Sequence, residues 1–347
     1  MSGVLIERTV VKSLAIMKIL GETSKAISPI MRKYLGKNVA KDFLPIVQHQ
    51  VKSGGKRVRP ALTILCCQAC GGKMEDALLP AAMIELIHNY SLIMDDIIDH
   101  GELRRGLPTV RAKYGDAQAL LAGMFHREVL GEIAWDTSQP GELYAIMVNA
   151  IKQTIEGERM DILCEQSVRD DGHLVTHRYT KVTPRLYFKI IQKKTAELIK
   201  AACVAGAIAA RAEGDYRQAV STYGDKVGLT FQVIDDFLDI FGEKTGKQKG
   251  KDIIEHKLNN IVIVYALAEM NPGERSKLEK IIKKTKLDKA ELDQAFALLN
   301  STKAKTKVLN VAGNLVKEAK VSLKILPETP ARQALEELAD FVASRLY

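Results

Sequence analysis

Residues 79–99 read LPAAMIELIHNYSLIMDDIID, an apolar run that ends in three closely spaced aspartates. The apolar residues recur at spacings of three and four, the period of one face of an α-helix; they are Leu79, Met83, Leu86, Tyr90 and Ile93. Most other segments show the same spacing, whereas period-two alternation bounded by turn residues is scarce. The sequence therefore predicts an all-α protein.

Clusters of turn residues interrupt this helical pattern. The interruptions fall at residues 53–56, 71–73, 101–108, 138–141, 242–250, 271–273 and 327–330. They divide the chain into about a dozen helices of ordinary length. Because no low-complexity linker separates two parts and no solenoid repeat is present, we predict one helical domain over residues 1–347.

The net charge of +9 indicates an anionic partner. Nucleic acid is not favoured, because no basic run is interleaved with aromatic residues. No stretch reaches the 18 uncharged apolar residues that would suggest a membrane span. The five cysteines are an odd number in a long chain, which is typical of a reduced, cytoplasmic protein. These features favour a cytoplasmic protein whose anionic partner is a phosphorylated small molecule or a membrane surface rather than nucleic acid.

The aspartate cluster occurs twice with the same spacing. Asp95, Asp96 and Asp99 form the first D-D-x-x-D motif. A second apolar stretch leads into Asp235, Asp236 and Asp239. On a helix, the first and last aspartates of each motif lie on one face, about 6 Å apart along the axis.

Local energetics oppose these aspartates. Like charges four residues apart destabilise a helix, and carboxylates are unfavourable at helix C-termini, where Gly101 and Gly242 place both motifs. A bound cation would reverse both effects. Mg²⁺ prefers carboxylate oxygens and completes its coordination shell with water and substrate phosphate. The repeated motif therefore predicts a magnesium-diphosphate site rather than two solvated acidic helix ends.

Cationic and polar residues accompany both motifs. Residues 54–60 read GGKRVRP and present Lys56 and Arg59 at a predicted helix start, where free N–H groups also bind anions. Arg forms bidentate bonds to phosphate oxygens. Further candidates lie beside an aspartate motif or on its helix face; they are His88, Arg104, Arg105, Gln232, Lys247 and Lys257. Lys194 and Thr195 are candidates that lie in the middle of the chain.

Taken together, these motifs resemble the trans-type polyprenyl diphosphate synthases, which include farnesyl and geranylgeranyl diphosphate synthases, and the pattern is most similar to the archaeal geranylgeranyl enzymes. The resemblance extends over about 200 residues, from Lys56 to Asp252, with order and spacing preserved. It implies an antiparallel helical bundle around a central cavity and a homodimer.

The resemblance also implies the roles of the site residues. Asp95, Asp99 and Asp235 would hold three Mg²⁺ ions on the allylic diphosphate, supported by Asp96, Asp236 and Asp239. Arg104, Lys194, Lys247 and Lys257 would bind the same diphosphate. Lys56, Arg59, His88 and Arg105 would bind isopentenyl diphosphate. Thr195 and Gln232 would stabilise the developing carbocation.

Two departures from the family pattern stand out. The family often has Gly-Lys-x-Thr where this chain has His256-Lys257-Leu258-Asn259. Arg111 stands where a histidine is common. Both concern substrate handling and leave the aspartates intact.

Product length is expected to depend on residues just before the first motif. Tyr90 and Ser91 lie five and four residues before Asp95. One aromatic residue with a small neighbour resembles the geranylgeranyl pattern, so we expect a C20 product, with C15 and C25 as alternatives. Tyr90 can also be explained as core packing. A non-catalytic subunit of a hetero-oligomeric prenyl synthase remains the alternative of another class.

Overall fold

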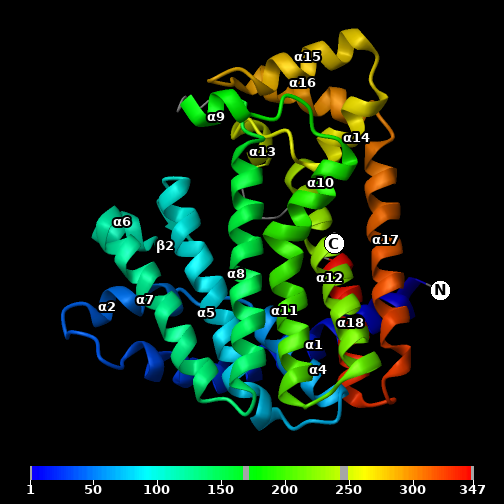
Figure 1. Cartoon of the computed structure of the whole chain (residues 1–347). Helices are drawn as coiled ribbons and strands as arrows, with labels where there is room; N and C mark the ends of the chain where they lie inside the picture. The colour runs from blue at the N-terminus through cyan, green and yellow to red at the C-terminus, as the bar shows by residue number, and fades with distance from the viewer. Residues whose placement is uncertain (1, 167–171, 243–248, 345–347) are drawn as a thin grey trace. The chain divides into compact units, whose positions relative to one another are not determined.

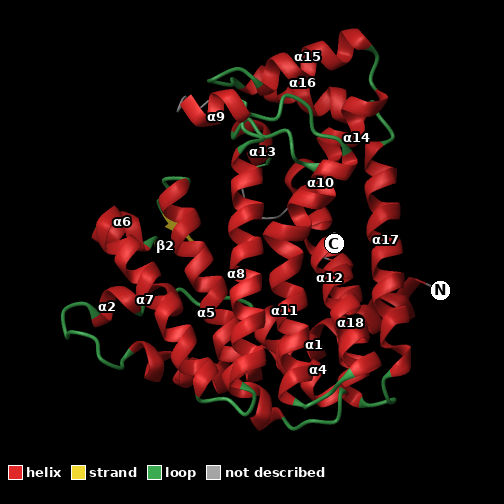
Figure 2. Cartoon of the chain, in the orientation of Figure 1, coloured by secondary structure: helices red, strands yellow, loops and turns green. Residues whose placement is uncertain are grey.

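The computed structural model describes the backbone of residues 2–166, 172–242 and 249–344, and the side chains from residue 14 onward within those ranges. Most of this part of the chain is helical, as Figure 2 shows. One two-stranded sheet interrupts the helices. The all-α prediction is confirmed.

The chain divides into two compact units, each assembled from separate segments. Unit 1 contains residues 1–152, 198–224 and 322–341, and unit 2 contains residues 153–197, 225–321 and 342–347. The expectations of a single domain and of a central cavity stay predictions.

Unit 1 is built from the helices of the N-terminal half, together with parts of later ones (Figure 1). Its elements up to the sheet are α1 (Ser2–Leu35), α2 (Leu44–Val47), α3 (His49–Lys52), α4 (Val58–Ala69), α5 (Met74–Ile98), β1 (Leu103–Arg104) and β2 (Leu107–Pro108). They are followed by α6 (Val110–Tyr114), α7 (Asp116–Trp135), the first part of α8 (Pro140–Ile162), most of α11 (Glu197–Ala209) and the beginning of α12 (Gly214–Phe241). The 3₁₀ turn η2 (Leu323–Ile325) and most of α18 (Pro330–Ala343) complete it.

The central helix of unit 1 is α5, which packs against α1, α4 and α7. Its apolar spacing puts Met83, Leu86 and Ile87 in the buried core of the unit. Gly123 lets α7 approach closely, because a Cβ at this position would lie 2.1 Å from the Met94 side chain. The helix that carries the first aspartate motif is therefore held along most of its length.

In the described part of the chain, α5 is also the one helix long and apolar enough to cross a membrane. About two thirds of its apolar window (67%) is buried against other helices. A core helix of a globular protein meets the same criteria of length and hydropathy, and burial on this scale is what such a helix shows.

Unit 2 contains the remaining helical segments. They are the end of α8, α9 (Gly172–His177), α10 (Pro184–Ile191), the π-helical turn η1 (Gln192–Ala196), the end of α12, α13 (Lys251–Ile254), α14 (Ile261–Glu269), α15 (Pro272–Ile282), α16 (Lys289–Asn300) and α17 (Ala304–Ser322). Their core is apolar and includes almost all of the first two turns of α14. Asn260 caps α14 by accepting a hydrogen bond from the N–H of Val262.

Candidate functional site

The first aspartate motif closes α5, as the sequence predicts. Asp95 is half-buried and Asp96 is buried, while Asp99 is exposed and forms the C-cap of the helix. The N–H of Gly101 donates to the carbonyl of Asp96 at 2.9 Å, which turns the chain away from the helix. Asp95 and Asp99 therefore lie one turn apart at the exposed end of a buried helix.

A hairpin then brings Arg104 back onto the motif. Strands β1 and β2 pair across a two-residue turn, Arg105 and Gly106, with φ angles of 55° and 78°. Positive φ at both central residues is the requirement of a type I′ turn, which suits a tight hairpin. Arg104 donates from Nε and Nη2 to the buried carboxylate of Asp96 at 2.7–3.0 Å. Asp96 thus holds the guanidinium beside the other two aspartates.

The same turn places Arg105 over the glycines of the GGKRVRP segment. The Arg105 guanidinium donates to the carbonyl of Gly54. Gly55 has a φ of 139°, which favours glycine, and a Cβ there would lie 2.7 Å from Arg105 Nη1, so a larger residue would displace the guanidinium. The structure therefore joins two motifs that lie about 50 residues apart in the sequence.

A buried ion pair supports the start of α4. Arg57 Nη1 donates to Glu85 of α5, and both side chains are only 3% exposed. Arg57 Nη2 also donates to the carbonyl of Val51 at 3.3 Å. Arg57 has a φ of 55°, an unfavourable value for a residue with a side chain. The ion pair holds Arg57 in this conformation. Arg57 is the N-cap of α4, so the pair also sets the start of the helix and the position of Arg59 in its first turn.

Positive charge exceeds negative charge around His88. Arg57 and Arg104 are paired with buried carboxylates, but the Arg59 Nε atom is buried without a hydrogen-bond partner among the described residues. Burial, and then the nearby arginines with Arg59 first, hold the pKa of His88 well below its usual value. His88 is therefore neutral at pH 7, and the cluster is suited to an anionic ligand.

The remaining predicted residues of unit 1 lie near this cluster in the sequence and differ in environment. Lys56 is exposed at the start of α4. Tyr90 is half-buried and packs against the core of the unit, as Phe125 does. Ser91 donates its hydroxyl to the carbonyl of His88 at 3.0 Å.

The second motif lies at the end of α12, in unit 2. Asp235 and Asp239 are half-buried, and Asp236 is buried. Asp236 accepts hydrogen bonds from the Tyr187 hydroxyl, the Gln232 amide and the backbone N–H of Ile261, at 2.7–3.0 Å. The middle aspartate is thus bonded to its surroundings in both motifs.

Gln232 also forms a hydrogen bond with Thr195. Both residues are expected to stabilise the carbocation, which requires them to lie close together. The Thr195 hydroxyl donates to Gln232 Oε1 at 2.8 Å. Thr195 lies in the π-helical turn η1, a distortion that is frequent at functional sites. Two glycines make room for this turn. A Cβ at Gly157 would lie 2.3 Å from the backbone N of Lys194, and one at Gly228 would lie 2.5 Å from the Cα of Ala196.

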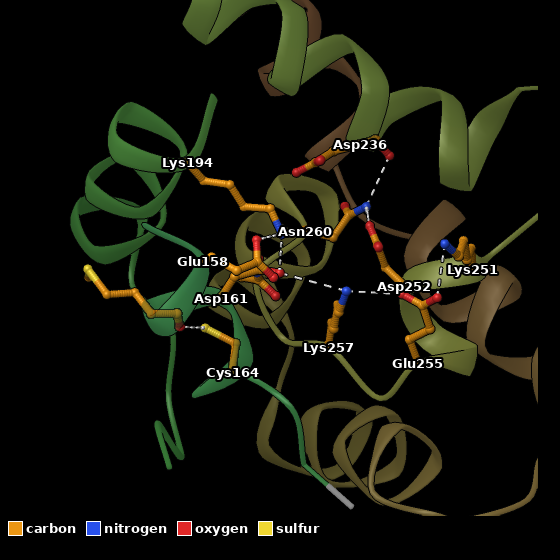
Figure 3. A network of polar contacts seen from close by, with 12 residues as sticks. Glu158, Asp161, Cys164, Lys194, Asp236, Lys251, Asp252, Glu255, Lys257 and Asn260 are labelled. Atoms are coloured by element: carbon orange, nitrogen blue, oxygen red, sulfur yellow. Dashed lines mark hydrogen bonds and ion pairs between the residues drawn. The ribbon is translucent and has the colours of Figure 1, made fainter. Parts of the chain in front are cut away.

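Lys194 and Lys257 approach the same carboxylate, as Figure 3 shows. Their Nζ atoms lie 2.6 and 3.7 Å from Asp161 Oδ2. Lys194 also pairs with Glu158 at 2.8 Å, and Asn259 donates to the other oxygen of Asp161. Burial raises the pKa of Asp161, but the two lysines outweigh it and lower the pKa to about 2.

Further carboxylates accumulate beside this network. Burial, and then the neighbouring Asp252, raise the pKa of Asp239 to about 7, although the N–H groups of Lys251 and Asp252 donate to its carboxylate. Burial also raises the pKa of Asp252. A hard cation would relieve this accumulation, so the carboxylates fit Mg²⁺.

No group of three or more histidine, cysteine or acidic side chains converges on one point within the described residues. Mg²⁺ held by one or two carboxylates takes its other ligands from water and substrate phosphate. The predicted phosphate ligand Lys247 lies outside the described residues.

Sequence reasoning missed several residues of these networks as site residues. Glu85 and Asp161 carry the buried counter-charges, and Tyr187 and Asn260 bond to the second motif. Glu85 left one signal, because it is a charged residue in an apolar run, one turn before His88. Asn260 follows Asn259 and precedes an apolar run, which is the usual place of an N-cap.

The chain matches the family model for polyprenyl synthetase over residues 40–299. It is 34% identical to a short chain isoprenyl diphosphate synthase of Methanothermobacter thermautotrophicus, over 95% of this chain and 98% of the relative. It is 31% identical to a geranylgeranyl diphosphate synthase of Methanosarcina mazei, over 86% of this chain and 89% of the relative. It is 30% identical to a geranylfarnesyl diphosphate synthase of Natronomonas pharaonis, over 86% of this chain and 89% of the relative.

Solved structures agree with these relatives. A geranylgeranyl pyrophosphate synthetase from Pyrococcus horikoshii superposes with a TM-score of 0.86 and 30% identity, over 96% of this chain and 99% of that one. A polyprenyl synthase from Caulobacter crescentus, complexed with calcium and isoprenyl diphosphate, superposes with a TM-score of 0.83 and 29% identity, over 96% and 97%. The chain belongs to the polyprenyl synthetase family and is a prenyltransferase.

Proposed function

We propose that this enzyme condenses isopentenyl diphosphate with allylic diphosphates and that its main product is geranylgeranyl diphosphate, with C20. One observation carries the proposal: each aspartate motif has a cluster of cationic side chains within its own unit. Such pairing of carboxylates with fixed cations suits a substrate that arrives as a metal-bound diphosphate and leaves as pyrophosphate.

The arginine cluster of unit 1 would bind isopentenyl diphosphate. Within the described residues, Arg59 and Arg105 are the arginines of this cluster without a bonded carboxylate, and Lys56 is exposed near them in the sequence. A neutral His88 would offer a hydrogen bond to the same diphosphate without adding charge. Arg104, which Asp96 holds, is assigned to the allylic diphosphate, as the family resemblance implies.

The allylic diphosphate would be held by Lys194, Lys257 and, as an expectation, Lys247. Asp95, Asp99, Asp235 and Asp239 are the candidate Mg²⁺ ligands, while Asp96 and Asp236 would act by holding Arg104 and Gln232. When bound, the metal would neutralise the leaving diphosphate. Calcium in the related Caulobacter crescentus structure supports a divalent ion in this fold.

The bond between C1 and the diphosphate oxygen would break first and leave an allylic cation. The Thr195 hydroxyl donates a hydrogen bond to Gln232, so the lone pairs of the Thr195 oxygen would be available to this cation. The isopentenyl double bond would then attack C1, and the departing diphosphate would accept the proton that is released. The residues of the site supply no separate general base for this step.

The C20 length is supported by the position of Tyr90. Its half-buried ring packs against the core of unit 1, one turn below the aspartates on α5. A rigid aromatic ring there would stop the growing chain, whereas Ser91, with its hydroxyl bonded to the helix backbone, would leave space. Tyr90→Ala is therefore expected to lengthen the product by one or more isoprene units. An unchanged product would place the stop elsewhere.

We further expect a homodimer in the cytoplasm. Leu120, Leu121 and Met124 of α7 are 48–56% exposed, which is the kind of apolar helix face that oligomers bury. Five free cysteines suit a reducing compartment. Light scattering of the purified protein measures the oligomeric state, and a monomer would contradict this expectation.

The test is incubation of the purified chain with labelled isopentenyl diphosphate, Mg²⁺ and dimethylallyl, geranyl or farnesyl diphosphate, followed by analysis of chain length. A C20 product that disappears with chelator supports both the chemistry and the role of Tyr90. A C15 or C25 product retains the chemistry and overturns the assigned length. No product with any starter would indicate a subunit that requires a catalytic partner.

A further inference from the structure

We propose that His256 is a positioning residue for Lys257 and thereby controls the affinity of the enzyme for the allylic diphosphate. The inference rests on the proposed function. It concerns the loop between α13 and α14, in which Lys257 is the cation that faces the site and His256 is the residue before it.

The backbone of this loop is unfavourable at His256. Its φ of 61° lies in the left-handed region, which costs about 1–2 kcal/mol for a residue with a side chain. The N–H of His256 donates to the carbonyl of Ile253 at 3.0 Å. A left-handed residue just after a helix is usually glycine, so another interaction must hold a histidine there.

The imidazole ring supplies that interaction. His256 is 3% exposed, and its Nδ1 lies 2.9 Å from the carbonyl oxygen of Ile282, the last residue of α15. A carbonyl can only accept, so Nδ1 carries the proton. The bond satisfies one of the carbonyls that every helix leaves unpaired at its C-terminus. His256 therefore ties the lysine loop to α15.

The backbone on both sides of His256 is also fixed. Its carbonyl accepts from the N–H of Gln166 at 3.0 Å, and the N–H of Lys257 donates to the carbonyl of Asp252 at 2.8 Å. Lys257 also forms an isolated β-bridge with Glu165. These bonds and the imidazole together determine where the Cα of Lys257 lies.

The position of that Cα decides the reach of the ammonium group. Lys257 Nζ lies 3.0 Å from Glu255 Oε2 and 3.7 Å from Asp161 Oδ2, so it approaches the same carboxylate as Lys194. Its partners raise the pKa of Lys257 against the effect of burial. A small rotation of the loop would move the Lys257 ammonium away from that of Lys194. The pair would then bind a diphosphate more weakly.

Three variants test the inference. His256→Gly retains the left-handed backbone and removes the side-chain bond, whereas His256→Asn tolerates the same φ and places an amide N–H near the position of Nδ1. The matched control is His126→Asn in unit 1. His126 is also buried, and its Nε2 lies 2.6 Å from the carbonyl of Val47.

The measurements are the Kd of a non-ionising allylic thiolodiphosphate with Mg²⁺, by calorimetry, and the KM of isopentenyl diphosphate. We expect His256→Gly to weaken the allylic Kd about tenfold, the scale of lost orienting bonds behind a ligand-binding group. The KM of isopentenyl diphosphate should not change. His256→Asn should recover most of the affinity, and His126→Asn should lower the melting temperature without changing either constant.

A purely structural role for His256 predicts another pattern, in which His256→Gly melts earlier and the bound fraction keeps the wild-type Kd. That result overturns the inference, as does an equal loss of affinity in His126→Asn. If the wild-type chain binds no allylic diphosphate at all, the proposed function fails together with the inference. If the wild-type enzyme elongates prenyl chains but His256→Gly binds the allylic diphosphate with the wild-type Kd, the inference fails while the proposed function stands.

Discussion

The two aspartate motifs stand in opposite electrostatic surroundings. Around the first, arginines outnumber their buried carboxylate partners, and Arg59 keeps a buried Nε without a partner among the described residues. Around the second, Lys194 and Lys257 share Asp161 and bond to further carboxylates. An excess of fixed cations can bind a diphosphate directly, whereas the half-buried carboxylates Asp239 and Asp252 beside the second network suit a diphosphate that carries metal ions.

The middle aspartates reveal what the two surroundings share. Asp96 holds an arginine and Asp236 holds a tyrosine and a glutamine, so each motif uses one carboxylate to organise its neighbours. The outer residues of each motif keep the greater exposure. The repeat in the sequence therefore corresponds to a repeat of structural roles, although the partners differ.

The largest expected effect comes from the buried ion pair of unit 1. Glu85→Gln removes the counter-charge of Arg57 in a site with 3% exposure, which should lower the free energy of unfolding by about 3–5 kcal/mol. Urea denaturation measures it. The exposed pair Arg159 and Glu156 is the control, and Glu156→Gln should cost less than about 1 kcal/mol. Equal losses would show that burial of the first pair does not matter.

The free energy of unfolding should depend on pH in a different range for a buried group of each unit. Burial lowers the pKa of His126 in unit 1 to about 4, against 6.5 in the unfolded chain, so its contribution is complete above pH 6.5 and is lost as the pH falls to about 4. The loss is about 3 kcal/mol. Asp161 in unit 2, with a pKa of about 2, loses its contribution only below pH 4.

The measurement is the free energy of unfolding between pH 7 and pH 2, for the wild type, His126→Asn and Asp161→Asn. The His126 variant should show a smaller dependence between pH 6.5 and 4, where His88 also contributes, and the Asp161 variant a smaller dependence between pH 4 and 2. The assignment of the windows would be wrong if both variants lost the same one.

The π-helical turn of unit 2 should be sensitive to its glycine. In Gly157→Ala the new methyl group would meet the backbone N of Lys194 at 2.3 Å, and overpacking of this kind costs about 1–3 kcal/mol. The displaced turn also carries Thr195, so kcat should fall. Gly131→Ala in α7 is the control, because nothing lies within 4 Å of its new methyl group.

Alanine at position 131 should instead stabilise the helix by about 0.5–1 kcal/mol, as Gly-to-Ala changes do in helices. Thermal unfolding and steady-state kinetics of both variants make the comparison. A Gly157→Ala enzyme with wild-type stability and kcat would show that η1 adjusts freely.

The smallest expected effect tests whether the arginine cluster of unit 1 and the lysines of unit 2 bind different substrates. Arg59→Met should raise the KM of isopentenyl diphosphate about tenfold and leave that of the allylic substrate unchanged, because a charged hydrogen bond contributes about 1.5–3 kcal/mol and neighbouring cations compensate in part. Lys257→Met should do the reverse. Kinetics with each substrate varied in turn measure both constants. Variants that raise both KM values equally would remove the distinction between the two sites.

Much of the fold could be predicted from the sequence, because helical periodicity and turn residues are local signals. The helix that carries Asp95 ends where Gly101 indicates, and α12 ends before Gly242. The hairpin at Arg104 was not anticipated as strands, since its two-residue strands are too short for a period-two pattern. It depends on positive φ at Arg105, which few arginines adopt.

The sequence by itself determined the all-α class, the two aspartate motifs and the types of residue that accompany them, because these are properties of spacing and chemistry along the chain. Only the tertiary structure decided which charges meet. Glu85 with Arg57, Asp161 with Lys194 and His256 with Ile282 join residues that lie more than 25 positions apart in the sequence. No local preference specifies such pairs; they form because a buried charge or carbonyl needs a partner, and packing determines which partner is within reach.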